Sequence, residues 1–181
     1  MEEKEKKLLK KIARKSIEAG LEGKEMLLDS EEIPASLKEN RGTFVTLKID
    51  NQLRGCIGHI EAVQELYKDV AENAYSAAFR DPRFPPLSKE EYQNLNISIS
   101  VLTKPERFVY QNTQELLEYL DKNKPGVILK KGTSQSTFLP QVWEDLKHPE
   151  EFLTHLSLKA GLAPDAWRDS VEIYTYTAEE I

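Results

Sequence analysis

The stretch Leu53-Arg54-Gly55-Cys56-Ile57-Gly58-His59 is preceded by an alternating run, Thr43-Phe44-Val45-Thr46-Leu47-Lys48-Ile49-Asp50. A short polar segment separates the two. Apolar and polar side chains alternate along the earlier run, which is typical of a β-strand with one buried face. Asp50-Asn51-Gln52 is typical of a turn, because Asp and Asn tolerate turn conformations and hydrogen-bond their own backbone. The two runs therefore predict a hairpin. Strand alternation places Leu53, Gly55 and Ile57 on one face of its second arm, and Arg54, Cys56 and Gly58 on the other.

The rest of the chain alternates between helical and strand patterns. Strands come in hairpins separated by helices, without a repeated strand–helix–strand series, which favours an α+β fold over a doubly wound one. We expect a single domain over residues 1–181, in which a smaller second lobe remains an alternative, with a mostly antiparallel or mixed sheet covered by helices. Apolar spacing predicts helices at 3–19, 61–79, 113–121, 141–146 and 149–160, a short helix after Ser88, and further strands at 96–102, 127–131, 134–139 and 171–176.

Three segments carry smaller expectations. Residues 20–41 are rich in loop signals, and Ile33, Leu37 and Leu27 are expected to tuck under the edge of the domain. Val63 and Leu158 are expected to belong to the apolar stripes of their helices.

Composition limits the function classes. The chain has 181 residues, a formal net charge of −6 and a mean hydropathy of −0.56. No apolar run approaches the roughly 20 residues that span a bilayer, and the charged N-terminal stretch lacks an apolar signal core, so we expect a cytoplasmic protein without membrane contact. The single cysteine excludes an internal disulfide. The negative charge argues against non-specific nucleic-acid binding, although a local basic patch on the first predicted helix keeps nucleic acid open as a weaker alternative.

Cys56 is the candidate catalytic nucleophile. A reactive thiolate is stabilised by nearby cations, and Arg54 is the cation expected on the same strand face. His59 is a weaker candidate for a general base. Gly55 and Gly58 would open space for a ligand. The alternative is that Cys56 is a small buried hydrophobe and that the glycines only allow tight packing of the following helix.

A proline-rich segment, Arg80-Asp81-Pro82-Arg83-Phe84-Pro85-Pro86-Leu87, follows the second predicted helix. Its prolines exclude helix, and the bond before Pro85 or Pro86 could be cis. Asp81 and Arg83 are candidate binding residues, since arginine forks suit carboxylate or phosphate. The simpler interpretation is an internal Arg–Asp pair that fixes the loop, with Phe84 as an apolar plug.

Ser98 and Ser100 alternate with apolar residues in strand 96–102. They could line a cleft together with Arg54, Cys56 and Arg83, or simply form a covered polar face. The three histidines show no metal-ligand spacing, and we expect neither a metal nor a cofactor.

Two of these motifs resemble the AMMECR (AMME chromosomal region) family. Leu53-Arg54-Gly55-Cys56-Ile57-Gly58 is similar to the family signature, and so is Asp81-Pro82-Arg83-Phe84-Pro85-Pro86 followed by the strand that ends at Val101-Leu102. Later elements also fit: Gly126-Val127 with Gly132, Leu139-Pro140-Gln141-Val142, and Lys159-Ala160-Gly161-Leu162. The resemblance covers residues 5–180.

The resemblance implies a cytosolic α+β protein, often with two unequal lobes. The family in turn is similar to protein A of the AmmeMemoRadiSam system. This similarity implies Memo-like and radical-SAM proteins as partners. Two functions stay open. One is an enzyme or catalytic subunit that acts on a small molecule or nucleotide through a cleft at Cys56 and Arg54. The other is a non-catalytic binding or adaptor protein for those partners.

Overall fold

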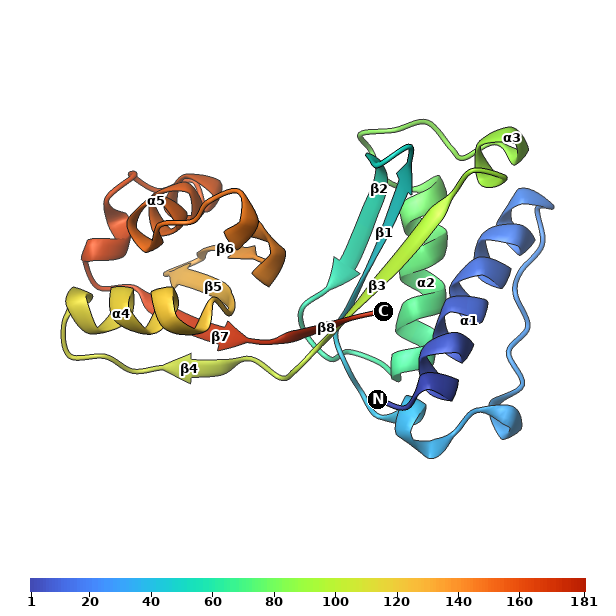
Figure 1. Cartoon of the computed structure of the whole chain (residues 1–181), viewed down its shortest axis with the longest axis horizontal. Helices are drawn as coiled ribbons and strands as arrows, with labels where there is room; N and C mark the ends of the chain where they lie inside the picture. The colour runs from blue at the N-terminus through green and yellow to red at the C-terminus, as the bar shows by residue number, and fades with distance from the viewer. The chain divides into compact units, whose positions relative to one another are not determined.

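The computed structural model describes residues 1–181, and the chain forms two compact units. The first unit contains residues 1–104 together with 179–181, and the second contains residues 105–178. Each unit has its own four-stranded sheet (Figure 1) and its own hydrophobic core. The predicted α+β class is confirmed, with two antiparallel sheets. All peptide bonds are trans, including those before Pro85 and Pro86.

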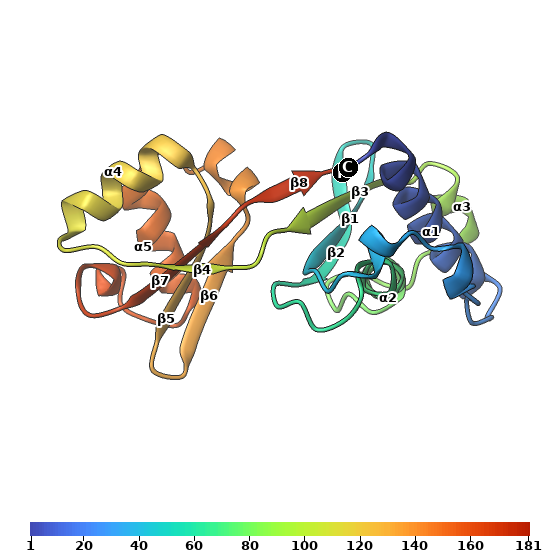
Figure 2. The ribbon, with the colours of Figure 1, turned by 90° about the horizontal axis from the view of Figure 1, so that it is seen from below.

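The sheet of the first unit has the strand order β2-β1-β3-β8, and helices α1 and α2 cover one of its faces (Figures 1 and 2). Strand β8 is joined to β3 by a pair of hydrogen bonds between Ile99 and Ile181, of 2.8 and 3.1 Å. The elements are α1 (Glu3–Leu21), the 3-10 helices η1 (Ser30–Glu32) and η2 (Ala35–Lys38), β1 (Thr43–Ile49), β2 (Gln52–His59), α2 (Leu66–Phe79), α3 (Lys89–Tyr92), β3 (Asn96–Leu102) and β8 (Ala178–Glu180).

Strand alternation explains this core. Val45 and Leu47 on β1, and Ile99 on β3, are completely buried. They pack with the apolar stripes of the two helices, in which every third or fourth residue is apolar. Burying a side chain of this kind contributes about 1.5–3 kcal/mol. The helical members are Leu9, Ile12, Ala13 and Ile17 on α1 and Leu66, Tyr67, Val70, Ala74, Ala77 and Ala78 on α2.

The second unit is a sheet in the order β4-β7-β5-β6 with α4 and α5 packed against it. Trp143 stacks on Phe152 with ring centroids 3.8 Å apart and donates from Nε1 to the carbonyl of Pro125. No helix of the chain has the length and apolar character of a membrane span. The elements are β4 (Glu106–Phe108), α4 (Thr113–Asn123), β5 (Gly126–Lys131), β6 (Ser134–Phe138), η3 (Pro140–Glu144), α5 (Pro149–Lys159), η4 (Ala166–Arg168) and β7 (Glu172–Tyr176).

Several sequence predictions need correction. Helix α2 begins at Leu66 instead of residue 61, because the backbone of Glu65 forms a β-bridge with Asn40. Val63 therefore lies before the helix, and it is 59% exposed instead of part of the apolar stripe. Leu27 is 93% exposed and does not tuck under the domain, whereas Ile33 and Leu37 are buried as expected. Leu158 is 51% exposed, outside the buried stripe of α5. The three-residue strands β4 and β8 were not predicted, since they are too short to show alternation.

Candidate functional site

The two family-like motifs meet at the free edge of β2. This strand is the outermost of its sheet, so one side of its backbone lacks a partner strand. The backbone N–H of Cys56 donates to Oδ2 of Asp81 at 3.0 Å, and Nη2 of Arg83 donates to the carbonyl of Cys56 at 3.3 Å. Side chains of the proline-rich segment therefore satisfy the free backbone groups of Cys56 at this edge.

Asp81 and Arg83 form the internal pair that was the simpler interpretation of this loop. Arg83 donates to the buried carboxylate from Nη2 at 2.7 Å, from Nε at 3.0 Å and from its backbone N–H at 3.1 Å. These hydrogen bonds hold the pKa of Asp81 far below its usual range, and the largest effect comes from the bond of the Arg83 side chain. The Arg83 side chain is still 54% exposed, so the pair presents a fixed cation at the surface.

Arg54 is buried and its guanidinium is engaged inside the unit. Nε donates to Oε2 of Glu91 at 2.6 Å, and Nη2 donates to the carbonyl of Pro85 at 2.6 Å. The hydrogen bond from Arg54 lowers the pKa of Glu91. The guanidinium also lies over the ring of Phe84, with its carbon 5.5 Å from the ring centroid. Arg54 thus fixes the proline-rich loop, and only Nη1 has no protein partner.

A β-bulge at Arg54 corrects the predicted strand phase. Gly55 pairs with Leu47 and Leu53 pairs with Lys48, which leaves Arg54 without a partner on β1. Leu53 consequently shares the face of Cys56 instead of that of Gly55. Only glycine fits at position 55, because a Cβ there would lie 2.1 Å from the carbonyl oxygen of Ala77 on α2.

The sulfur of Cys56 lies on the sheet face opposite to the two helices. Thr46 is paired with both Cys56 and Ser98, so these three residues form a row across β2, β1 and β3. Cys56 and Ser98 are therefore roughly 10 Å apart across two strand spacings. Cys56 is half-buried, Sγ lies 3.3 Å from Oγ1 of Thr46, and the neighbouring Ser100 is buried. The predicted face is assembled, but neither Arg54 nor an imidazole contacts the sulfur.

His59 is directed to the other face of the sheet. It pairs with Thr43, on the helix-covered side, and its Nδ1 lies 2.7 Å from Oδ1 of Asp69. It therefore does not supply a base to Cys56. Because Nδ1 faces a carboxylate, we assign the proton to Nδ1, and Nε2 is then the acceptor nitrogen. The imidazole is 37% exposed, whereas the Asp69 side chain is fully buried.

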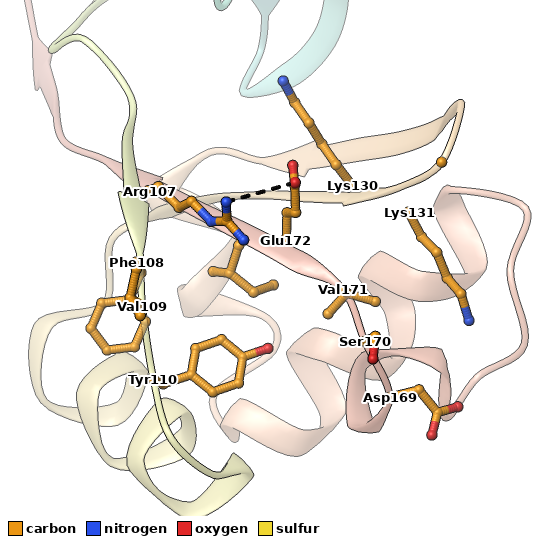
Figure 3. A pocket seen from close by; sticks show the side chains of 12 residues that line it. Arg107, Phe108, Val109, Tyr110, Lys130, Lys131, Asp169, Ser170, Val171 and Glu172 are labelled. Carbon is orange, nitrogen blue, oxygen red and sulfur yellow. Dashed lines mark ion pairs between the residues drawn. The ribbon is translucent and has the colours of Figure 1, made fainter.

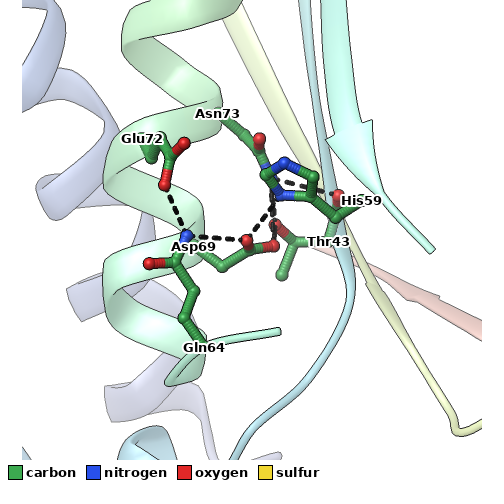
Figure 4. Close-up of polar contacts among 6 residues, drawn as sticks. All are labelled: Thr43, His59, Gln64, Asp69, Glu72 and Asn73. Carbon is green, nitrogen blue, oxygen red and sulfur yellow. Dashed lines mark hydrogen bonds and ion pairs between the residues drawn. The ribbon is translucent and has the colours of Figure 1, made fainter. Parts of the chain in front are cut away.

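Asp69 is the centre of a polar network that the sequence patterns above did not predict (Figure 4). Its two oxygens accept from Thr43 Oγ1 at 2.6 Å, Asn73 Nδ2 at 3.0 Å and Gln64 Nε2 at 3.0 Å, besides His59. Four donors compensate for burying the carboxylate. The signal was present in the sequence, since Asp69 and Asn73 lie four residues apart within the apolar stripe of α2. No group of three His, Cys, Asp or Glu side chains in the chain is arranged to hold a metal ion.

The family model described as AMMECR1 matches residues 10–181. This chain belongs to the AMMECR1 family. Among the relatives of this AMMECR1 protein, protein NEQ441 of Nanoarchaeum equitans is 42% identical over 94% of this chain and 96% of its own length. Protein MJ0810 of Methanocaldococcus jannaschii is 40% identical, over 93% of this chain and 85% of its own. The crystal structure of PH0010 from Pyrococcus horikoshii matches with a TM-score of 0.90 and 36% identity, over 99% of this chain and 92% of that one.

Proposed function

We propose that this AMMECR1 protein is a non-catalytic binding subunit that holds a Memo-like or radical-SAM protein. The observation that carries the proposal is how the motifs use their charges. Arg54 is engaged by Glu91, and Asp81 is engaged by Arg83 and by the backbone of Cys56. Such internal pairing builds a rigid surface, in which Arg83, the cation that donates to the carbonyl of Cys56, is already paired with Asp81.

The binding surface in this proposal, the motif surface, consists of exposed residues of the two motifs. Leu53 is 42% exposed, the Arg83 side chain is 54% exposed, and three prolines around them are exposed. Proline has a fixed φ and arginine is here already oriented, so little conformational entropy is lost on binding. Arginine is also enriched at protein interfaces. The prolines are Pro82, Pro85 and Pro86.

The test measures binding of the purified full chain to Memo-like and radical-SAM proteins from the same organism by calorimetry. Leu53→Asp and Pro86→Asp introduce charge on the motif surface and should each weaken binding about tenfold or more. Leu27→Asp is the matched control, because Leu27 is 93% exposed elsewhere in the same unit. Thermal unfolding of each variant verifies that it is folded.

Cys56→Ser should leave partner binding unchanged, and the thiol should react with a disulfide reagent no faster than free cysteine. A thiol that reacts faster at neutral pH would favour a nucleophile over a binding subunit. Failure of both partner proteins to bind the unaltered chain would refute the proposal. Equal binding by the control and the motif-surface variants would refute the proposed surface.

A second candidate function is acid–base catalysis at His59. The specific observation is the 2.7 Å contact between His59 Nδ1 and the buried carboxylate of Asp69, which fixes the imidazole and leaves Nε2 as a proton acceptor. In this case His59→Gln would abolish turnover of a small-molecule substrate while Cys56→Ser would retain it. Partner binding that survives His59→Gln would separate this function from the first.

A further inference from the structure

A pocket of about 660 Å³ opens in the second unit at the beginning of β7 (Figure 3). Strand β7 starts at Glu172, opposite Lys130 of β5, and Phe108 of β4 pairs with Ile173. Residues 109–110 after β4 and Lys131 of β5 line the pocket together with the segment 169–173. Its volume lies within the range of about 300–1,000 Å³ that is usual for small-molecule sites.

The polar groups of four side chains in this pocket have no partner in the chain, although the ring of Tyr110 stacks on Phe108. Lys131, Asp169, Tyr110 and Ser170 all line it, and none of their side chains makes a hydrogen bond or an ion pair with the rest of the chain. Burial raises the pKa of the Tyr110 phenol, and no hydrogen bond opposes this effect. In Figure 3 the phenol oxygen of Tyr110 is directed toward Val171, with Asp169 and Lys131 beyond it.

The other charges of the pocket are already engaged. Arg107 lies 3.8 Å from Glu172, and the ammonium group of Lys130 lies 4.7 Å from the centroid of the Tyr174 ring. One cation, Lys131, and one anion, Asp169, therefore stay available to a ligand. Apolar side chains complete the lining, among them Phe108, Val109, Val171 and Ile173.

We propose that this pocket binds a free amino acid with an apolar side chain. A ligand with one positive and one negative group complements one free anion and one free cation. Its carboxylate pairs with Lys131 and its ammonium group with Asp169. Its side chain contacts the apolar lining formed by Val109 and Val171, and the hydroxyls of Tyr110 and Ser170 supply further hydrogen bonds.

The test is a titration of the isotope-labelled full chain with L-leucine, followed by the NMR amide signals of the residues that line the pocket. Leucinamide lacks the carboxylate and N-acetyl-leucine lacks the ammonium group. Leucyl-glycine keeps the apolar residue but moves the carboxylate, so it distinguishes a free amino acid from the start of a peptide. Each of the three should bind about tenfold more weakly than leucine, because each loses a charge-assisted hydrogen bond.

Lys131→Met and Asp169→Asn should each weaken leucine binding by the same factor. Lys131→Met should also remove the preference for leucine over leucinamide, which a general loss of packing would not do. The matched control is Lys122→Met, an exposed lysine on α4 of the same unit. The absence of saturable shifts up to the solubility limit of leucine would overturn the proposal. Equal weakening by Lys122→Met, or equal binding of leucine and leucinamide, would also overturn it. The proposed partner-binding function rests on the other unit and is unaffected by either result.

Discussion

The carboxylate of Asp81 accepts the backbone N–H of Cys56 at 3.0 Å, although the two residues are 25 positions apart. This contact joins the two motifs, because the same carboxylate also binds Arg83. The motif around Cys56 and the proline-rich motif are therefore one structural element. A substitution in either motif should therefore disturb the structure of the other.

Asp81→Asn should destabilise the first unit by about 2 kcal/mol at pH 7, because it weakens charge-assisted bonds to Arg83 and Cys56. The folded-state pKa of Asp81 lies below its unfolded value of about 3.9. This stabilisation is therefore complete above about pH 4 and is lost as the pH falls further, so the difference between wild type and variant should shrink in acid. Urea unfolding at several pH values, followed by NMR signals of the first unit, measures it. Glu90→Gln, which alters an exposed carboxylate, is the control, and a difference that persists unchanged in acid would contradict the prediction.

Gly55→Ala should destabilise the first unit by about 3 kcal/mol. The added Cβ would lie 2.1 Å from the backbone oxygen of Ala77, so β2 and α2 must separate. Gly132→Ala has open space around the Cβ but a φ of +61°, and should cost only about 1 kcal/mol. Denaturant unfolding of both variants makes the comparison. Similar costs at the two positions would show that the close helix approach is not limiting.

Asp69→Ala should cost about 3 kcal/mol or more, because it removes the acceptor of the buried Thr43 hydroxyl and one acceptor each of Asn73 and Gln64, which keep their bonds to Thr43 and Glu72. His59→Ala should cost only about 1 kcal/mol, since three donors still serve the carboxylate. Urea unfolding midpoints give the order of the two variants. The reverse order would mean that the imidazole, and not the carboxylate, organises this region.

Tyr176 should be the last tyrosine to ionise in the folded protein. Burial raises its pKa to about 12, and its hydroxyl contacts Thr137 and the carbonyl of Phe138. A raised folded-state pKa stabilises the second unit below the unfolded value of about 10, and this contribution is lost as the pH rises toward 12. Ultraviolet pH titrations of wild type and Tyr176→Phe should differ by one tyrosine, which ionises near pH 12 in the wild type only. If the variant titrates like wild type throughout, Tyr176 is not the buried group.

Local patterns predicted the hairpin at residues 43–59, the strand at 96–102 and most helices, because alternation and helical spacing depend on neighbours in sequence. The bulge at Arg54 could not be predicted in this way, since it is a shift in the register between two strands that alternation within one strand does not reveal. The contact between the two motifs is likewise a long-range one. The pairing of Asp69 with His59 was accessible in part, because a polar pair on the buried face of α2 requires a partner.

The position of β8 has a consequence for the order of folding. Strands β3 and β8 are neighbours in one sheet, yet the whole of residues 105–178 lies between them along the chain. On the ribosome, β3 must wait with an open edge until that intervening segment has been synthesised, which leaves time for the second unit to fold first. A slow-folding second unit would thus lengthen the period in which nascent chains can pair wrongly through β3.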